Sequence, residues 1–175
     1  RRRARLIVEK FFPTIKSAIP NYQRSQKALK PIIIKFSPDV IHAHDYTALP
    51  IATEIAQMLK AEGKKVSLIY DAHEYVPGVS HLTKPLVNAY TKAERAGVLM
   101  ADAVLSVSEP MSDLLIQHLK LKKRPIIVAN DPLVAGQQKA KRNLRKECGI
   151  DKKTPLLVYS GAVAPQRGIS TAIAA

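Results

Sequence analysis

The chain has 175 residues, of which 46% are hydrophobic, so it is long enough and apolar enough to bury a core. Its single cysteine excludes a framework of disulfide bonds and suits a reducing compartment. The 28 Lys and Arg residues outnumber the 14 acidic ones, and the net charge of +14 indicates either an anionic partner or a solvated basic surface. Aromatic residues make up only 5% and no nucleic-acid-binding motif is present, which argues against nucleic acid as the partner.

The apolar runs and the ends of the chain bear on its cellular context. No run approaches the roughly 20 apolar residues of a membrane helix, and no signal peptide is visible, so we expect a cytoplasmic protein. The chain starts at Arg1 without a methionine and stops at Ala175 within a helical pattern. We therefore expect it to be a fragment of a longer protein.

Basic and apolar side chains alternate with helical spacing over the first 36 residues. Apolar residues at positions 8, 11, 12, 15 and 19 fit one helical face, which Pro13 interrupts. A second helical piece is predicted over 24–30, and 31–36 either continues it or forms an extended turn. The ordinary interpretation is an amphipathic helix that packs on a sheet. The alternative is a basic helix that lies on an acidic membrane surface.

Strands and helices alternate from residue 40 to residue 129. Short links between such elements are typical of an α/β fold with a doubly wound, Rossmann-like parallel sheet and right-handed connections. The predicted strands are 40–43, 66–70, 103–107 and 126–129, and the predicted helices are 47–62, 86–100 and one that begins after Ser108.

Capping residues and apolar stripes define the predicted helices. Thr47 is expected to cap the first helix and Gly63 to end it, whereas Ser108 caps the last one with Pro110 in its first turn. The side chains expected to face the core are Ala52, Ile55, Ala56 and Leu59 from the first helix and Leu114, Leu115 and Leu119 from the last.

The composition changes after residue 130. Residues 131–153 are polar and basic apart from a short predicted helix near 144–148, and a strand over 155–159 and a helix that begins near Gly168 follow. We predict a first Rossmann-like domain over 1–130 that lacks its first strands. A linker over 131–153 and the start of a second Rossmann-like domain over 154–175 complete the chain.

Two histidines mark the end of the first predicted strand. His42 and His44 alternate along it, so both point to one face. His42 lies inside the strand, where we expect a buried histidine satisfied by a hydrogen bond. His44 lies at the carboxyl end, where open α/β sheets bind ligands, and it is therefore the functional candidate.

Polar residues also end the second predicted strand. Asp71 and His73 share a face, and we expect them to gather with His44, Asp45 and Glu74 at one rim of the sheet. Imidazoles and carboxylates can bind metals, and paired carboxylates can serve hydrolysis. The chain has no HExxH motif and no cysteine ligand beside this rim, so we expect no metal, and a metallohydrolase stays an alternative.

The loop over 160–168 follows a predicted strand and precedes a helix. Gly161 allows close backbone approach, Arg167 supplies a charged fork, and the helix beginning near Gly168 exposes free N–H groups. This loop is either a phosphate cradle or a plain turn. Asn130, which precedes an Asp-Pro pair, is interpreted first as part of a turn and second as part of a ligand loop.

Five stretches in this order resemble the retaining, nucleotide-sugar-dependent glycosyltransferases of family four, the family that includes glycogen and sucrose synthases. The resemblance covers residues 38–175 and implies the GT-B architecture, in which two Rossmann-like domains face each other across a cleft. The first domain then binds the acceptor and the second binds the donor nucleotide. The stretches are PDVIHAHD (38–45), ADAVLSVSE (101–109), IVANDP (127–132), LVYSG (157–161) and QRGI (166–169).

The resemblance implies roles for residues of the first domain. His44 matches the family's active-site histidine near the donor sugar. His73 and Glu74 lie at a strand end that usually faces the acceptor or the donor sugar. The remaining candidates for substrate contacts are Asp45, Asp71, Ser108 and Asn130.

The resemblance also implies where the donor phosphates bind. Gly161, Arg167 and Gly168 match the family's phosphate-binding loop, with arginine in place of the usual lysine. Ala162 departs from the pattern, since the family usually has an arginine after that glycine, so one phosphate contact is missing. The expected mechanism needs no metal, no cofactor beyond the nucleotide-sugar co-substrate and no protein nucleophile.

Together these patterns predict an enzyme that transfers a sugar from a nucleotide sugar to a glycan or lipid-linked acceptor. It is expected to be cytoplasmic and peripheral on the inner face of the membrane, and the fragment alone is expected to be inactive. One alternative is a nucleotide-sugar 2-epimerase of the same fold. The other is a catalytically inactive nucleotide-sugar-binding protein, which Ala162 suggests.

Overall fold

The computed structural model describes residues 22–131 and 142–175. The chain forms two compact units, Arg1–Asn130 and Asp131–Ala175. The helical face predicted over positions 8–19 lies outside the described residues.

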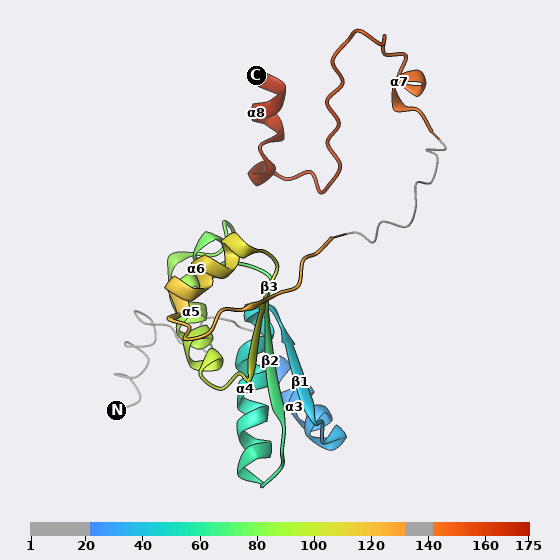
Figure 1. Cartoon of the computed structure of the whole chain (residues 1–175). Coiled ribbons are helices and arrows are strands. Elements are labelled where there is room, and N and C mark those ends of the chain that lie inside the picture. Colours follow the sequence, from blue (N-terminus) through green and yellow to red (C-terminus); the bar gives the residue numbers. More distant parts are fainter. Residues whose placement is uncertain (1–21, 132–141) are drawn as a thin grey trace. The chain divides into compact units, whose positions relative to one another are not determined.

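The first unit is built on a four-stranded, all-parallel sheet with the order β1-β2-β3-β4 (Figure 1). Helices follow the first three strands along the chain, so the predicted α/β class and Rossmann-like parallel sheet are confirmed. The strands are β1 (Val40–His44), β2 (Ser67–Ala72), β3 (Ala103–Ser106) and β4 (Ile126–Ile127). The helices are α3 (Tyr22–Phe36), α4 (Asp45–Ala61), the short 3₁₀ turn η1 (Val76–Gly78), α5 (Lys84–Val98) and α6 (Glu109–Leu119).

Side chains of β1 alternate between the core and the opposite face of the sheet. Ile41 and Ala43 are buried, whereas Val40, His42 and His44 are exposed, because successive residues of a strand point to opposite faces. The core side of β1 packs with β2 and α4. The predicted apolar stripe of α4 is confirmed, since Ala52, Ile55, Ala56 and Leu59 are all buried.

The predicted start of α4 is wrong, whereas its predicted end is confirmed. The helix begins at Asp45, with His44 as its N-cap, so the prediction that Thr47 caps it is wrong. The strand runs into the helix without a loop, and no polar cap is left between them. At the other end Gly63 has a left-handed φ of 80° just after the C-cap Glu62, which confirms it as the stop.

Helix α6 has the predicted cap. The Ser108 side chain accepts a hydrogen bond from the Met111 backbone N–H at 3.3 Å. Leu115 and Leu119 are buried, but Leu114 is 43% exposed, so its predicted inward orientation is wrong. The buried face of α6 is formed by Ser112, Leu115 and Leu119. Leu114 points about 100° away from Leu115, toward the solvent side of that face.

Two other boundaries differ from the predicted ones, and a third decides between two predicted alternatives. Helix α3 runs without a break through residues 31–36, which confirms the continuation rather than the turn. Strand β2 extends past Tyr70 because Asp71 pairs with both neighbouring strands. Strand β4 is only two residues long, since only Leu105 and Ser106 of β3 pair with it.

The second unit contains short helices in its described part, residues 142–175. These are α7 (Leu144–Glu147), the 3₁₀ turn η2 (Pro165–Arg167) and α8 (Ile169–Ala174), which confirm the two predicted helix positions. The predicted strand over 155–159 is wrong: Leu157 is 83% exposed, and a strand needs a paired neighbour that residues 142–175 do not supply.

No helix in the described ranges is long and apolar enough to span a lipid bilayer.

Candidate functional site

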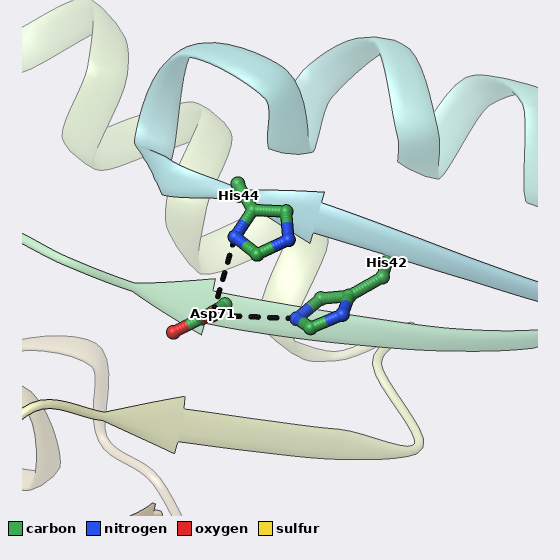
Figure 2. Close-up of side chains that lie close together, drawn as sticks. All are labelled: His42, His44 and Asp71. Carbon is green, nitrogen blue, oxygen red and sulfur yellow. Dashed lines mark ion pairs between the residues drawn. The ribbon is translucent and has the colours of Figure 1, made fainter. Parts of the chain in front are cut away.

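The carboxyl ends of β1 and β2 bring histidines and an aspartate to one face of the sheet. In the parallel register His44 lies opposite Asp71, and His42 lies opposite Ile69. Because alternate residues share a face, His42, His44 and Asp71 project to the same side (Figure 2). His73 follows Asp71 by two positions and reaches the same group.

The Asp71 carboxylate is the centre of this group. Its Oδ2 atom lies 3.3 Å from His42 Nε2, 3.3 Å from His44 Nδ1 and 3.4 Å from His73 Nε2. His44 Nδ1 and His73 Nε2 lie 3.3 Å apart, and the rings of His42 and His44 stack with centroids 4.1 Å apart. We refer to these four residues as the histidine–Asp71 cluster.

The cluster combines an inner carboxylate with outer imidazoles. Only 13% of the Asp71 side chain is exposed, against 39% for His42, 62% for His44 and 36% for His73. The prediction of a buried His42 is therefore wrong. The core packs against the opposite face of β1, so both histidines are exposed although His42 lies further inside the strand. His42 therefore belongs to the site.

Asp45 and Glu74 border the cluster. The Asp45 carboxylate accepts a hydrogen bond from the Tyr46 backbone N–H at 2.7 Å, and its backbone has a φ of 69°. Burial is the main cause that raises the pKa of Asp45, and the negative charges of Glu74 and Asp71 raise it further. The structure thus brings His44, Asp71 and His73 together as expected, and Asp45 is close enough to His73, Asp71 and Glu74 to interact with their charges.

A second carboxyl lies in the core of the same unit and was not predicted. Glu94 of α5 is 1% exposed and accepts a 2.5 Å hydrogen bond from the Tyr70 hydroxyl. Burial raises the pKa of Glu94 to about 7. Helical spacing could have found it, since Glu94 follows buried Tyr90 by four positions and precedes buried Gly97 by three.

The remaining first-unit candidates lie near other strand ends. Ser108 follows β3 and uses its hydroxyl to cap α6. Asn130 is exposed beyond β4. Their substrate contacts stay predictions.

The predicted phosphate loop lies in the second unit. Arg167 is exposed within η2, and Gly168 has a left-handed φ of 67° that ends η2 and precedes α8. Gly161 is exposed, and the Tyr159 hydroxyl donates a 2.8 Å hydrogen bond to the Ala162 carbonyl. Phosphate binding by this loop stays a prediction.

The histidine–Asp71 cluster offers three kinds of chemistry. Imidazoles can exchange protons near neutral pH, imidazoles and carboxylates can hydrogen-bond to sugar hydroxyls, and both can bind cations. Ligand atoms of His42, His44 and Asp71 all lie within 4.8 Å of one another. The expectation of no metal stays a prediction.

The imidazoles and carboxylates lie at the carboxyl ends of a Rossmann-like parallel sheet, which is the edge where open α/β sheets bind ligands. The chain belongs to Glycosyltransferase Family 4, because the model of that family matches residues 1–132. A comparison with curated proteins found no match. The resemblance to a family-four glycosyltransferase is thereby confirmed, and the family implies a sugar donor and an acceptor in general terms.

Proposed function

We propose that this chain comprises most of the acceptor-side domain and the start of the donor-side domain of a glycosyltransferase, which moves a sugar from a nucleotide sugar to a glycan or lipid-linked acceptor with retention of configuration. Family membership supports transfer between a sugar donor and an acceptor. The observation that carries the proposal is the meeting of His44 and His73, with ring nitrogens 3.3 Å apart, at the ends of neighbouring parallel strands. That edge is where open α/β sheets bind ligands.

In this proposal the outer side chains of the site contact the sugars. His44 has the most exposed ring of the cluster, with 62% of its side chain accessible, and it is the group offered to the donor sugar. His73 and Glu74 face the acceptor or the donor sugar. Asp71 is mostly buried and fixes the orientation of the rings. Additional substrate contacts are proposed for Asp45, Ser108 and Asn130.

The donor phosphates are proposed to bind the loop of the second unit. Arg167 is exposed, and its guanidinium matches the geometry of phosphate oxygens. Gly161 and Gly168 let the backbone approach closely. Negative charge that develops on the departing phosphates would then be stabilised by Arg167 and backbone N–H groups, without a metal cofactor. Ala162 supplies no charge, so Arg167 carries this task.

We also propose that α3 rests on an acidic membrane at the cytoplasmic face. Leu29, Ile32 and Phe36 are 46%, 53% and 79% exposed, and their spacing of three and four residues places them on one side of the helix. Lys27 and Lys35 lie on the same helix, which suits anionic headgroups. Binding to acidic but not neutral vesicles, weakened by salt, is expected. Equal or absent binding to the two kinds of vesicle contradicts the proposal.

A screen with nucleotide sugars tests the proposed reaction. The full-length protein is incubated with UDP-, GDP-, ADP- and TDP-sugars and mixed glycan or glycolipid acceptors, and both the donor and the acceptor products are identified. A glycosylated acceptor with the donor's anomeric configuration is expected. A changed donor sugar without an acceptor product indicates a 2-epimerase, and thermal stabilisation without turnover indicates an inactive binding protein. Either outcome overturns the proposal.

A further inference from the structure

We propose that the histidine–Asp71 cluster is a binding site for a divalent transition-metal ion, with zinc as the best fit, and that a bound ion inhibits the enzyme. The binding site stands on the geometry of the cluster alone. The inhibition rests on the proposed function, in which His44 contacts the donor sugar.

Three ligand atoms of the cluster form a nearly equilateral triangle. Its sides are 3.3 Å between His44 Nδ1 and Asp71 Oδ2, 3.4 Å between His73 Nε2 and Asp71 Oδ2, and 3.3 Å between the two nitrogens. Zinc binds imidazole and carboxylate at about 2.0–2.1 Å, and the edges of a tetrahedron with such bonds measure about 3.3–3.4 Å. The triangle therefore has the size of one face of a tetrahedral zinc site.

His42 is placed to add a further ligand. Its Nε2 atom lies 3.3 Å from the same Asp71 oxygen, and one ring nitrogen of His42 lies within 4.8 Å of ligand atoms of His44 and Asp71. Figure 2 shows the His42 and His44 rings directed at Asp71 from the same strand. A site with His42 as fourth ligand is closed, whereas a site without it leaves one position for water or substrate.

Charge and access also favour an ion at this place. Asp71 is a nearly buried carboxylate surrounded by imidazoles, which bind metals in their neutral form, so a divalent cation would compensate its charge. The imidazoles form the outer layer, and His44 is 62% exposed, so an ion can enter from solvent. Because His44 and Asp71 are paired on neighbouring strands, little ordering is needed on binding.

The ligand set discriminates between ions. Imidazoles suit zinc, copper and nickel, whereas magnesium and calcium prefer sites made of oxygen atoms alone. We therefore expect zinc to bind and magnesium not to bind. A bound zinc occupies the Nδ1 lone pair of His44 and leaves the proton on Nε2, so the ring can no longer take up a proton while it serves the donor sugar.

Calorimetric titration with zinc tests the site without an activity assay. The full chain carrying Cys148→Ser is used, because Cys148 is an exposed free thiol that could bind zinc by itself. We expect one zinc ion to bind per chain and magnesium to give no heat of binding. His44→Ala and Asp71→Asn should each weaken zinc binding by at least about tenfold, whereas His81→Ala, an exposed histidine outside the cluster, should not.

Cobalt spectroscopy and thermal melting complete the binding test. Cobalt at this site should give the strong visible absorption of tetrahedral coordination, and His44→Ala should abolish it. Melting curves show whether each variant is folded, and the exposed His44 keeps the test valid if Asp71→Asn unfolds. Absence of zinc binding, or zinc binding that His44→Ala leaves unchanged, overturns the site.

Inhibition is tested with the donor and acceptor identified by the nucleotide-sugar screen. Turnover should fall as zinc fills the calorimetrically defined site and should return when a chelator removes the ion. Turnover that persists with the site saturated overturns the inhibition but not the site. If no donor supports turnover, the proposed function and the inhibition both fail, and calorimetry still decides whether the metal site exists.

Discussion

The Tyr70 hydroxyl of β2 donates a 2.5 Å hydrogen bond to Glu94 Oε1 of α5, and both side chains are at most 1% exposed. Among the described residues, the second carboxylate oxygen of Glu94 is buried without a hydrogen-bond partner. Burial raises the pKa of Glu94 to about 7, the hydrogen bond from Tyr70 acts in the opposite direction, and the Asp45 charge raises it further. The fold therefore favours the protonated form of this carboxyl.

This pair predicts that the first unit loses stability as the pH rises from about 4.5 to about 7. Glu94 releases its proton near its ordinary pKa of 4.5 when the chain is unfolded, but only near 7 when it is folded. The stabilisation is therefore complete below about pH 4.5 and is lost as the pH rises to about 7. The shift corresponds to roughly 3 kcal/mol, to be measured as the free energy of unfolding from urea titrations across this range.

Glu94→Gln isolates this contribution from other titrating groups. The amide keeps the shape of the side chain and cannot ionise. The free energy of unfolding of the variant, relative to that of the native protein, should therefore increase as the pH rises. Parallel curves for the two proteins between pH 4.5 and pH 7 would show that Glu94 does not govern this dependence.

Gly97 is required where α5 approaches α4. A Cβ atom on Gly97 would lie 2.6 Å from both Cγ and Cδ2 of Leu49, a side chain that is fully buried. Gly97→Ala should therefore lower the free energy of unfolding by about 1–3 kcal/mol through overpacking, although alanine favours helix. Denaturant unfolding of the single variant measures this cost.

A double-mutant cycle with Leu49→Ala gives the matched control. Removal of the Leu49 side chain opens the space that the new methyl group needs. In the Leu49→Ala background, Gly97→Ala should therefore lower the free energy of unfolding by less, or even raise it. Additive costs of the two substitutions would contradict the steric explanation.

Local pattern was sufficient to predict most elements of the first unit. Short apolar runs that end in polar residues predicted the approximate positions of β1, β2 and β3. Ser108 and Gly63 marked helix ends, since capping is a property of a few adjacent residues. The convergence of His44 and Asp71 was predictable because neighbouring parallel strands end at one edge.

The remaining features depend on contacts between distant segments. The exposure of His42 follows from which face of β1 the helices cover, and the sequence of the strand does not contain that information. The strand expected over 155–159 has the right composition, but strand formation requires a paired neighbour. The length of β4 was overestimated for the same reason, because its pairing with β3 sets its limits.

Asp45 occupies a backbone conformation that few side chains adopt. Its φ of 69° lies in the left-handed region, and its carboxylate accepts the 2.7 Å hydrogen bond from the Tyr46 N–H. Asp45→Ala keeps the steric cost of a Cβ atom and loses the hydrogen bond, whereas Asp45→Gly loses only the hydrogen bond. The glycine variant should therefore be more stable than the alanine variant by about 1 kcal/mol in denaturant unfolding.

Asp45→Asn is the control for the hydrogen bond. Asparagine keeps the acceptor oxygen and tolerates the left-handed region, so this variant should unfold close to the native protein. An alanine variant as stable as the glycine variant would show that the strand-to-helix junction relaxes and that φ does not determine the choice of residue.

His44 should matter for turnover far more than for folding. The side chain is 62% exposed and lies outside the core, so His44→Ala should change the free energy of unfolding by no more than about 0.5 kcal/mol. In the proposed reaction its ring contacts the donor sugar, and its loss should lower kcat/KM by about 100-fold or more. Steady-state kinetics with the identified donor and denaturant unfolding of the same preparations give the two numbers.

His42 and His81 provide matched comparisons for this variant. His42 stacks on the His44 ring with centroids 4.1 Å apart, so His42→Ala should lower kcat/KM less than His44→Ala does, through a less well-positioned ring. His81→Ala removes an exposed imidazole outside the cluster and should leave both measurements unchanged. If His44→Ala keeps full turnover while its stability falls, the end of β1 supports the fold and the reacting groups lie elsewhere.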